Sequence, residues 1–346
     1  MVWTPVQGRW CVFPAGAPDR GREICMVTVR PKRWRLLGMV LAGMVLVGLL
    51  GGGLVAGPSA AASTRPITTS SRYESTTDPG ALYAQGKADG LAGLDGATIL
   101  DWGRPASANG TLGTVDFAGH FDAESAILAG AKSYADAYYA YSPRYSVMHL
   151  MLGTSNSCGS GQPCGTVTCG CSNEPVSFYA FGQSWAGLTN GLQAYIAAKP
   201  AYYTTVMNGD AADDAEPGYD PGFTNTYNLL AGYAATSSRP LADYGSLDGG
   251  LYSSAWSPDQ QYQVAYGFAP DVPFPEIYYS VQASQWAGLD HWSVANRGHQ
   301  MTIFGVLTQY PSGGYTPQQG YDQMLYDLNN NYSDTHQSSI QWSSNI

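Results

Sequence analysis

Positive charge is scarce in this sequence. Lys and Arg contribute 16 residues against 26 Asp and Glu. Seven of those 16 but only two of the acidic residues lie in the first 62 positions, so nine basic residues face 24 acidic ones from residue 63 on, a net charge of −15. Nucleic-acid binding needs clustered Lys and Arg, and a field of this sign repels phosphate backbones and anionic lipids. The composition therefore excludes a DNA- or RNA-binding protein.

Metal-binding motifs and internal repeats are also missing. The five histidines form no His-x-x-x-His or His-Glu pair, so we expect neither a metal nor a cofactor. No segment recurs at the period of a repeat protein, which argues against a solenoid. Aromatic residues, in contrast, are plentiful, with 25 Tyr and nine Trp. Such a chain has enough apolar surface for a substantial core.

The first 62 residues are typical of export machinery. A basic stretch at 31–35 precedes an apolar run at 36–55 and a small-residue segment at 58–62. This order predicts a signal peptide cleaved after Ala62, with translation starting at Met1 or at Met26. The run is also long enough to remain as a single membrane anchor, which is the alternative. We expect a secreted protein that meets the membrane only through this leader.

Four of the six cysteines lie close together after the leader. In an oxidising compartment this spacing favours two disulfides that close a surface loop at 158–171. Three pairings are open, and a zinc site that recruits His149 is the alternative. The residues concerned are Cys158, Cys164, Cys169 and Cys171.

Composition divides the remaining chain into three parts. Residues 63–80 are rich in Ser and Thr without apolar periodicity, which predicts a solvated spacer. Residues 81–330 form the folded domain, which we expect to be a monomer, and 331–346 form a polar tail.

Short apolar runs alternate with helical patterns along this domain. Strands are predicted at 97–100, 146–152, 203–207, 240–244, 263–268, 276–279 and 301–307, with an eighth at 113–118. Helices are predicted at 122–138, 178–195, 225–234, 281–296 and 316–328, the last capped by Thr316 with Pro317 at its first position. Regular alternation predicts an α/β fold with parallel strands, foremost a (β/α)8 barrel and otherwise a doubly wound sheet.

Carboxylates follow several of these strands. In a parallel barrel the carboxyl ends of all strands open onto one face, so acids far apart in sequence converge there. Crowded carboxylates raise one another's pKa, which supplies a protonated acid beside an ionised partner, as glycoside hydrolysis requires. The candidate catalytic residues are Glu216, Asp214, Asp101, Asp243 and Glu276.

These residues resemble those of glycoside-hydrolase barrels of the lysozyme-like (muramidase) kind. The likeness consists of Asp101 after the first strand and of Asp214, Ala215 and Glu216 at a middle strand end. It implies that Glu216 is the general acid and that Asp214 positions the sugar. A chitinase-type signature needs an acid where Ala212 stands. Residues 95–330 also resemble an uncharacterised group of exported proteins of high-GC bacteria.

The sequence leaves other functions open. Trp102, Tyr244 and Tyr278 are candidates for an aromatic wall that binds polysaccharide or peptidoglycan glycan, and such a barrel needs no catalysis. The acidic run 210–220 is also compatible with a structural loop or a calcium site. Ser184 lies in an approximate Gly-x-Ser-x-Gly motif and predicts, as a third function, an esterase.

Overall fold

The computed structural model describes residues 2–6, 9–13, 25–26, 67–157, 168–169, 177–200 and 205–346. The chain divides into two compact units, Met1–Pro58 and Ser59–Ile346. In the first unit, β1 (Val2–Val6), β2 (Arg9–Phe13) and β3 (Cys25–Met26) form an antiparallel sheet. The apolar run 36–55 and the side chains of the four clustered cysteines lie outside the described residues. None of the helices in the described ranges combines the length and apolar composition needed to span a membrane.

The second unit is an α/β fold built on parallel strands. A six-stranded sheet has the order β14-β13-β12-β10-β6-β5, and a three-stranded sheet has the order β15-β16-β4. Every neighbouring pair in both sheets is parallel. The strands are β4 (Ile67–Ser70), β5 (Arg72–Tyr73), β6 (Gly96–Asp101), β10 (Val147–Ser155), β12 (Val206–Asp214), β13 (Leu241–Asp243), β14 (Asp271–Pro273), β15 (Gly305–Thr308) and β16 (Trp342–Asn345).

Backbone hydrogen bonds connect the two parallel sheets at both margins. On one side, β4 runs into β5 through Ser71, whose N–H donates to the Asn345 carbonyl at 2.8 Å. On the other side, the Phe304 N–H donates to the Pro273 carbonyl at 2.8 Å, and Glu276 forms a parallel bridge with Leu307. No margin of these two sheets is therefore left without a link to the other sheet in the part of the chain that the structure describes.

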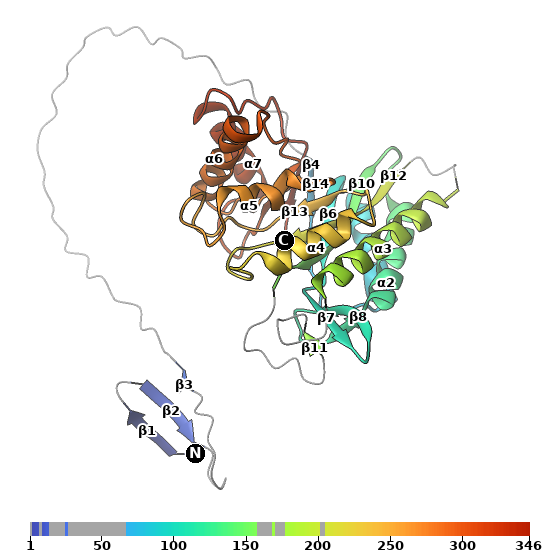
Figure 1. The fold of residues 1–346 in the computed structure, drawn as a ribbon. Helices are drawn as coiled ribbons and strands as arrows, with labels where there is room; N and C mark the ends of the chain where they lie inside the picture. The colour runs from blue at the N-terminus through green and yellow to red at the C-terminus, as the bar shows by residue number, and fades with distance from the viewer. Residues whose placement is uncertain are drawn as a thin grey trace, which may run out of the picture. The chain divides into compact units, whose positions relative to one another are not determined.

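Helices alternate with the strands as the apolar stripes predict. In Figure 1, α2, α3 and α4 lie next to one another, and α6 packs on α7. The last of them begins as expected, because Thr316 forms a capping box with Gln319 and Pro317 occupies the first turn. The helices are α1 (Pro79–Ala92), α2 (Glu124–Tyr141), α3 (Phe178–Ala197), α4 (Thr224–Ala234), α5 (Pro258–Tyr262), α6 (Ser280–Arg297) and α7 (Pro317–Asn330).

Strand alternation separates two apolar clusters in this unit. Leu100, Leu150 and their neighbours pack against helices α1–α4, whereas Ile99 and Met151 belong to a cluster on the other face of the six-stranded sheet. Successive side chains of a strand point to opposite faces. The face that carries Ile99 and Met151 is called the inner face below.

Three strands of an antiparallel sheet are inserted between β6 and α2, and its fourth strand, β11, lies between β10 and α3. The sheet has the order β11-β7-β8-β9 and lies at one end of the unit (Figure 1). The chain enters it at Gly103, whose φ is 81° and where a Cβ atom would collide with the Val115 carbonyl. Glycine thus lets the hairpin fold back closely. The strands are β7 (Arg104–Ala108), β8 (Thr111–Val115), β9 (Phe121–Ala123) and β11 (Thr168–Cys169).

The structure differs from the expected spacer and tail. Residues 67–73 form β4 and β5 instead of a solvated spacer, and β16 lies between β15 and β4 instead of in a polar tail. The side chains of Thr69, Ser71 and Ser344 are buried and bond one another, with Thr69 Oγ1 to Ser344 Oγ at 2.9 Å and Ser71 Oγ to Ser344 Oγ at 2.7 Å. A strand whose inward positions are hydroxyls carries no hydrophobic signal, which explains the wrong prediction.

Two predicted strands are also wrong. Residues 263–268 continue α5 as a π-helical segment, Gln263–Gly267, and 276–279 contribute only the Glu276 bridge. A third is shifted, since β12 extends to Asp214 and the acidic run begins as a buried strand rather than a loop. The segment 113–118 does contain a strand, β8, but in the antiparallel sheet.

Candidate active site

Carboxylates gather at the carboxyl ends of the parallel strands. Asp101 ends β6, Asp214 ends β12, and Glu276 follows β14. Asp214 is the most perturbed of them, because burial raises its pKa well above the usual range and the charges of Glu276, Glu216 and Asp101 raise it further. The structure thus brings the five predicted catalytic residues into one electrostatic cluster, since the charges of Glu276 and Glu216 also raise the pKa of Asp243.

A cavity of about 430 Å³ opens beside Asp214. One wall comes from the ends of β10 and β12 and the loop after β12, and the other comes from the antiparallel sheet. Of the five candidate catalytic residues, Asp214 is the one that lines it. The lining residues are Gly103, Arg104, Val115, Asp116, Phe117, Ala118, Gly119, Ser155, Ser157, Asp214 and Tyr219.

Glu216 is half-buried two residues beyond Asp214. Burial and then the charge of Asp248 raise its pKa, while hydrogen bonds with Ser246 and Tyr219 lower it. Tyr219 also lines the cavity, so the Glu216 carboxyl is tied to the cavity wall. Of the two neighbouring acids, Glu216 is consequently the one that ionises more readily.

Asn156 holds the backbone of this segment and was missed by sequence reasoning. Its Oδ1 accepts from the Glu216 N–H at 3.1 Å, and its Nδ2 donates to the Glu216 carbonyl at 3.0 Å and to Thr226 Oγ1 at 2.9 Å. Asn156 is fully buried. The available signal was an amide residue directly after the end of a buried strand.

Glu276 is held by tyrosines. The Tyr278 hydroxyl donates to Glu276 Oε1, and Tyr278 in turn shares a hydrogen bond with Tyr73 at the end of β5. Burial raises the pKa of Glu276 to about 8, with the Tyr278 bond acting in the opposite direction and the Glu216 charge adding to the rise. Glu276 therefore keeps its proton at neutral pH. Tyr278 orients this acid and does not belong to the cavity lining.

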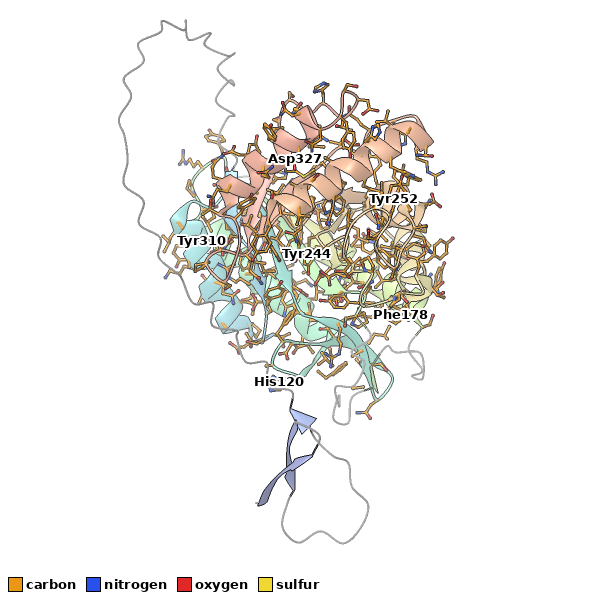
Figure 2. All side chains as sticks on the ribbon, turned by 90° about the vertical axis from the view of Figure 1, so that its left-hand side faces the viewer. His120, Phe178, Tyr244, Tyr252, Tyr310 and Asp327 are labelled. Carbon is orange, nitrogen blue, oxygen red and sulfur yellow. The ribbon has the colours of Figure 1, made fainter. Side chains whose placement is uncertain are left out.

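Asp101 and Tyr244 do not line the cavity. Both are fully buried, and Tyr244 lies near the middle of the view in Figure 2. The Gly103 N–H donates to Asp101 Oδ1 at 2.8 Å, and the Tyr244 hydroxyl bonds the same carboxyl. Burial raises the pKa of Asp101 to about 7 against these bonds. The prediction of Tyr244 as a substrate-binding side chain is thus corrected: Tyr244 is buried, and its hydroxyl hydrogen-bonds the Asp101 carboxyl.

Trp102 also differs from its prediction as a cleft residue. It is fully buried in the apolar cluster against the helices, and its Nε1 donates to the Thr76 carbonyl at 3.1 Å. Strand alternation explains the error, since Asp101 on the inner face forces the next residue toward the helices.

Asp243 does not line the cavity, although it interacts with the acids around Asp214. It is paired in register with Asp213 and lies on the face of Leu241, which packs toward the helices. Burial and then the charges of Asp213, Glu276 and Glu216 raise the pKa of Asp243 well above its usual range. Its role is therefore electrostatic, and it is not assigned a contact with the reacting bond.

Asp101 does not follow the first parallel strand of the unit. The strand pair β4–β5 precedes β6, and the acid that follows it is Glu74. Glu74 is buried and accepts from Gln85 Nε2 of α1 at 3.1 Å, so it faces a helix. The muramidase resemblance relied on an Asp after the first strand, and Asp101 does not occupy that place in the chain order.

Among the described residues, neither the esterase alternative nor a metal site has the geometry that it needs. Ser184 lies inside α3, where its hydroxyl donates to Glu124, and a helix interior cannot form a strained nucleophile elbow. Within the described ranges, no group of three or more His, Cys, Asp or Glu side chains is arranged to hold a metal ion.

Comparisons with other proteins leave the site to be interpreted from its own geometry. Neither the models of known protein families nor the sequences of curated proteins give a significant match to this chain.

Proposed function

We propose that this chain is a secreted glycoside hydrolase that acts on a cell-wall or environmental polysaccharide. The observation that carries the proposal is the cavity beside Asp214, where buried carboxylates raise one another's pKa. Glycosidases place two carboxyl groups of different pKa on either side of the bond that is cleaved.

The scaffold in this proposal is a closed barrel of eight parallel strands. Supporting it, the two parallel sheets are hydrogen-bonded at both margins, through Ser71 to Asn345 and through Phe304 to Pro273. With β4 and β5 counted as one strand, the strands follow one another around the barrel in chain order. Active sites of such barrels lie at the carboxyl ends of the strands, where Asp214 stands.

In the proposed reaction Asp214 is the general acid and Glu216 is its ionised partner. Asp214 is assigned as the acid because burial and neighbouring charges raise its pKa well above the usual range, whereas Glu216 has hydrogen bonds with Ser246 and Tyr219 that favour ionisation. The Asp214 proton passes to the glycosidic oxygen as the bond to the anomeric carbon breaks. Glu216 then attacks that carbon or activates water. These roles reverse those implied by the muramidase resemblance.

A glycan-binding protein without catalysis is the second candidate. Phe117 and Tyr219 line the same cavity and are 54% and 40% exposed, so aromatic faces are available to a sugar. Binding of this kind needs no proton on Asp214.

Sugar release from a glycan panel that includes peptidoglycan tests the hydrolase. Asp214→Asn and Glu216→Gln should each lower kcat by about 10² to 10⁴, because each removes a group that acts on the reacting bond. Asp322→Asn, an exposed acid on α7, is the matched control and should retain full activity. A wild-type protein that releases nothing but is retarded by a glycan in affinity electrophoresis supports the binder, and Asp214→Asn with wild-type kcat contradicts the assigned acid.

A further inference from the structure

The turn between β8 and β9 presents an aromatic ring to the cavity. Phe117 lies in this turn, lines the cavity together with Asp214 and is 54% exposed. Single exposed apolar side chains are common on protein surfaces. Phe117 differs from them because it belongs to the wall of the cavity beside Asp214 and is fixed from two sides.

Asp116 fixes the turn from the backbone side. Its buried carboxyl accepts from the Ala118 N–H at 2.9 Å and from the His120 N–H at 2.8 Å. The turn closes with the Gly119 N–H donating to the Asp116 carbonyl at 3.0 Å, where Gly119 has a φ of 85°. A turn tied to Asp116 at three points, two at its carboxylate and one at its backbone carbonyl, holds its side chains in fixed directions.

Tyr73 fixes the ring itself. The Phe117 and Tyr73 ring centroids are 4.6 Å apart, with their planes inclined by 54°. Tyr73 is bonded to Tyr278, which is bonded to Glu276, so the exposed ring is joined by contacts to the carboxylate cluster. The ring is thus positioned before any ligand arrives, and a preorganised side chain loses little entropy on binding.

We propose that Phe117 is the stacking platform for a pyranose ring of the substrate, which it holds against Asp214. The inference rests on the proposed function and specifies its substrate: a polysaccharide whose sugar units carry equatorial substituents and so expose a flat face of C–H groups. That face packs on the phenyl ring, while the hydroxyl groups at its edge reach Ser155 and Tyr219 in the same cavity.

The test compares Phe117→Ala, Phe117→Leu and Phe117→Trp in the secreted full chain. Phe117→Ala should raise KM about tenfold, a loss of about 1.4 kcal/mol of binding, and change kcat less than twofold. Phe117→Trp should retain the wild-type KM, and Phe117→Leu, which is apolar but not flat, should behave like Phe117→Ala. Tyr252→Ala is the control, because Tyr252 is 80% exposed and lies far in the view of Figure 2 from His120 at this turn.

Retardation by glycans in affinity electrophoresis separates this inference from the hydrolase proposal. If the wild type binds a glycan without cleaving it and Phe117→Ala abolishes the retardation, the result supports Phe117 as the stacking platform and contradicts the hydrolase proposal. If the wild type cleaves a glycan and Phe117→Ala or Phe117→Leu has the wild-type KM, the platform is overturned while the hydrolase stands. A wild type that neither binds nor cleaves any glycan overturns both.

Discussion

The buried carboxyl of Asp213 is costly to ionise, because no polar group in the described part of the chain solvates its charge. Neither of its oxygens has a hydrogen-bond partner among the residues that the structure describes. Burial and then the charge of Asp101 raise its pKa from 3.8 to about 8. Because the folded state holds the proton more tightly than the unfolded state does, stability is fully present below pH 3.8 and is lost as the pH rises toward 8.

We expect Asp213→Asn to remove part of this pH dependence. The variant should match the wild type at pH 4 and be more stable at pH 8 by a few kcal/mol, since one pKa unit corresponds to about 1.4 kcal/mol. Thermal unfolding of both proteins at the two pH values measures the difference. A pH dependence equal to that of the wild type would show that Asp213 titrates normally.

The cap of α7 makes a prediction for a whole helix. Thr316 Oγ1 accepts from the Gln319 N–H at 3.3 Å, and Gln319 Oε1 accepts from the Thr316 N–H at 3.0 Å. Thr316→Ala removes the side-chain acceptor and should lower the free energy of unfolding by about 1 kcal/mol, whereas Thr316→Ser should retain it. Denaturant unfolding monitors both variants, and equal midpoints for Ala and Ser would contradict a contribution from the cap.

Helices with an apolar stripe could be predicted from the sequence, and some strands could not. The stripes of α2, α3 and α6 identify their buried faces, because burial in these helices follows a 3.6-residue period. The strands β4 and β16 place Thr69 and Ser344 inside, where hydrogen bonds rather than apolar contacts hold them. Residues 263–268 are a short apolar run, and periodicity alone does not distinguish a strand from a buried helical turn.

The candidate site was predictable where it depends on strand direction. Asp101 and Asp214 were expected at one edge because parallel strands end together, and they interact electrostatically in the structure. Glu276, which was predicted to open a strand at 276–279, instead follows β14 and joins them. Which face a side chain occupies depends on register, so Trp102 and Asp243 were assigned to the wrong side. The strand before the turn that carries Phe117 was predicted at 113–118, but its place in an antiparallel sheet was not.

Acidic side chains determine how the stability of the whole molecule depends on pH and which ligands its charge repels. Four acids, Asp101, Asp213, Asp214 and Glu276, are buried with raised pKa values, and the chain carries a net charge of −10. Each raised pKa favours the folded state at acidic pH. The net charge repels anionic polymers, which favours a neutral glycan as substrate. The proposed activity therefore belongs to a protein that is most stable where its catalytic acid is protonated.

The pH dependence of kcat/KM for glycan hydrolysis tests this account most directly. Activity should fall at low pH as Glu216 becomes protonated and at high pH as Asp214 loses its proton. Above its pKa of about 8, Glu276 carries a charge that raises the pKa of Asp214. Glu276→Gln removes that charge, so the alkaline limb of this variant should move to lower pH. An alkaline limb that stays in place in Glu276→Gln, or no sugar release at any pH from 4 to 9, would contradict the assignment of Asp214 as the catalytic acid.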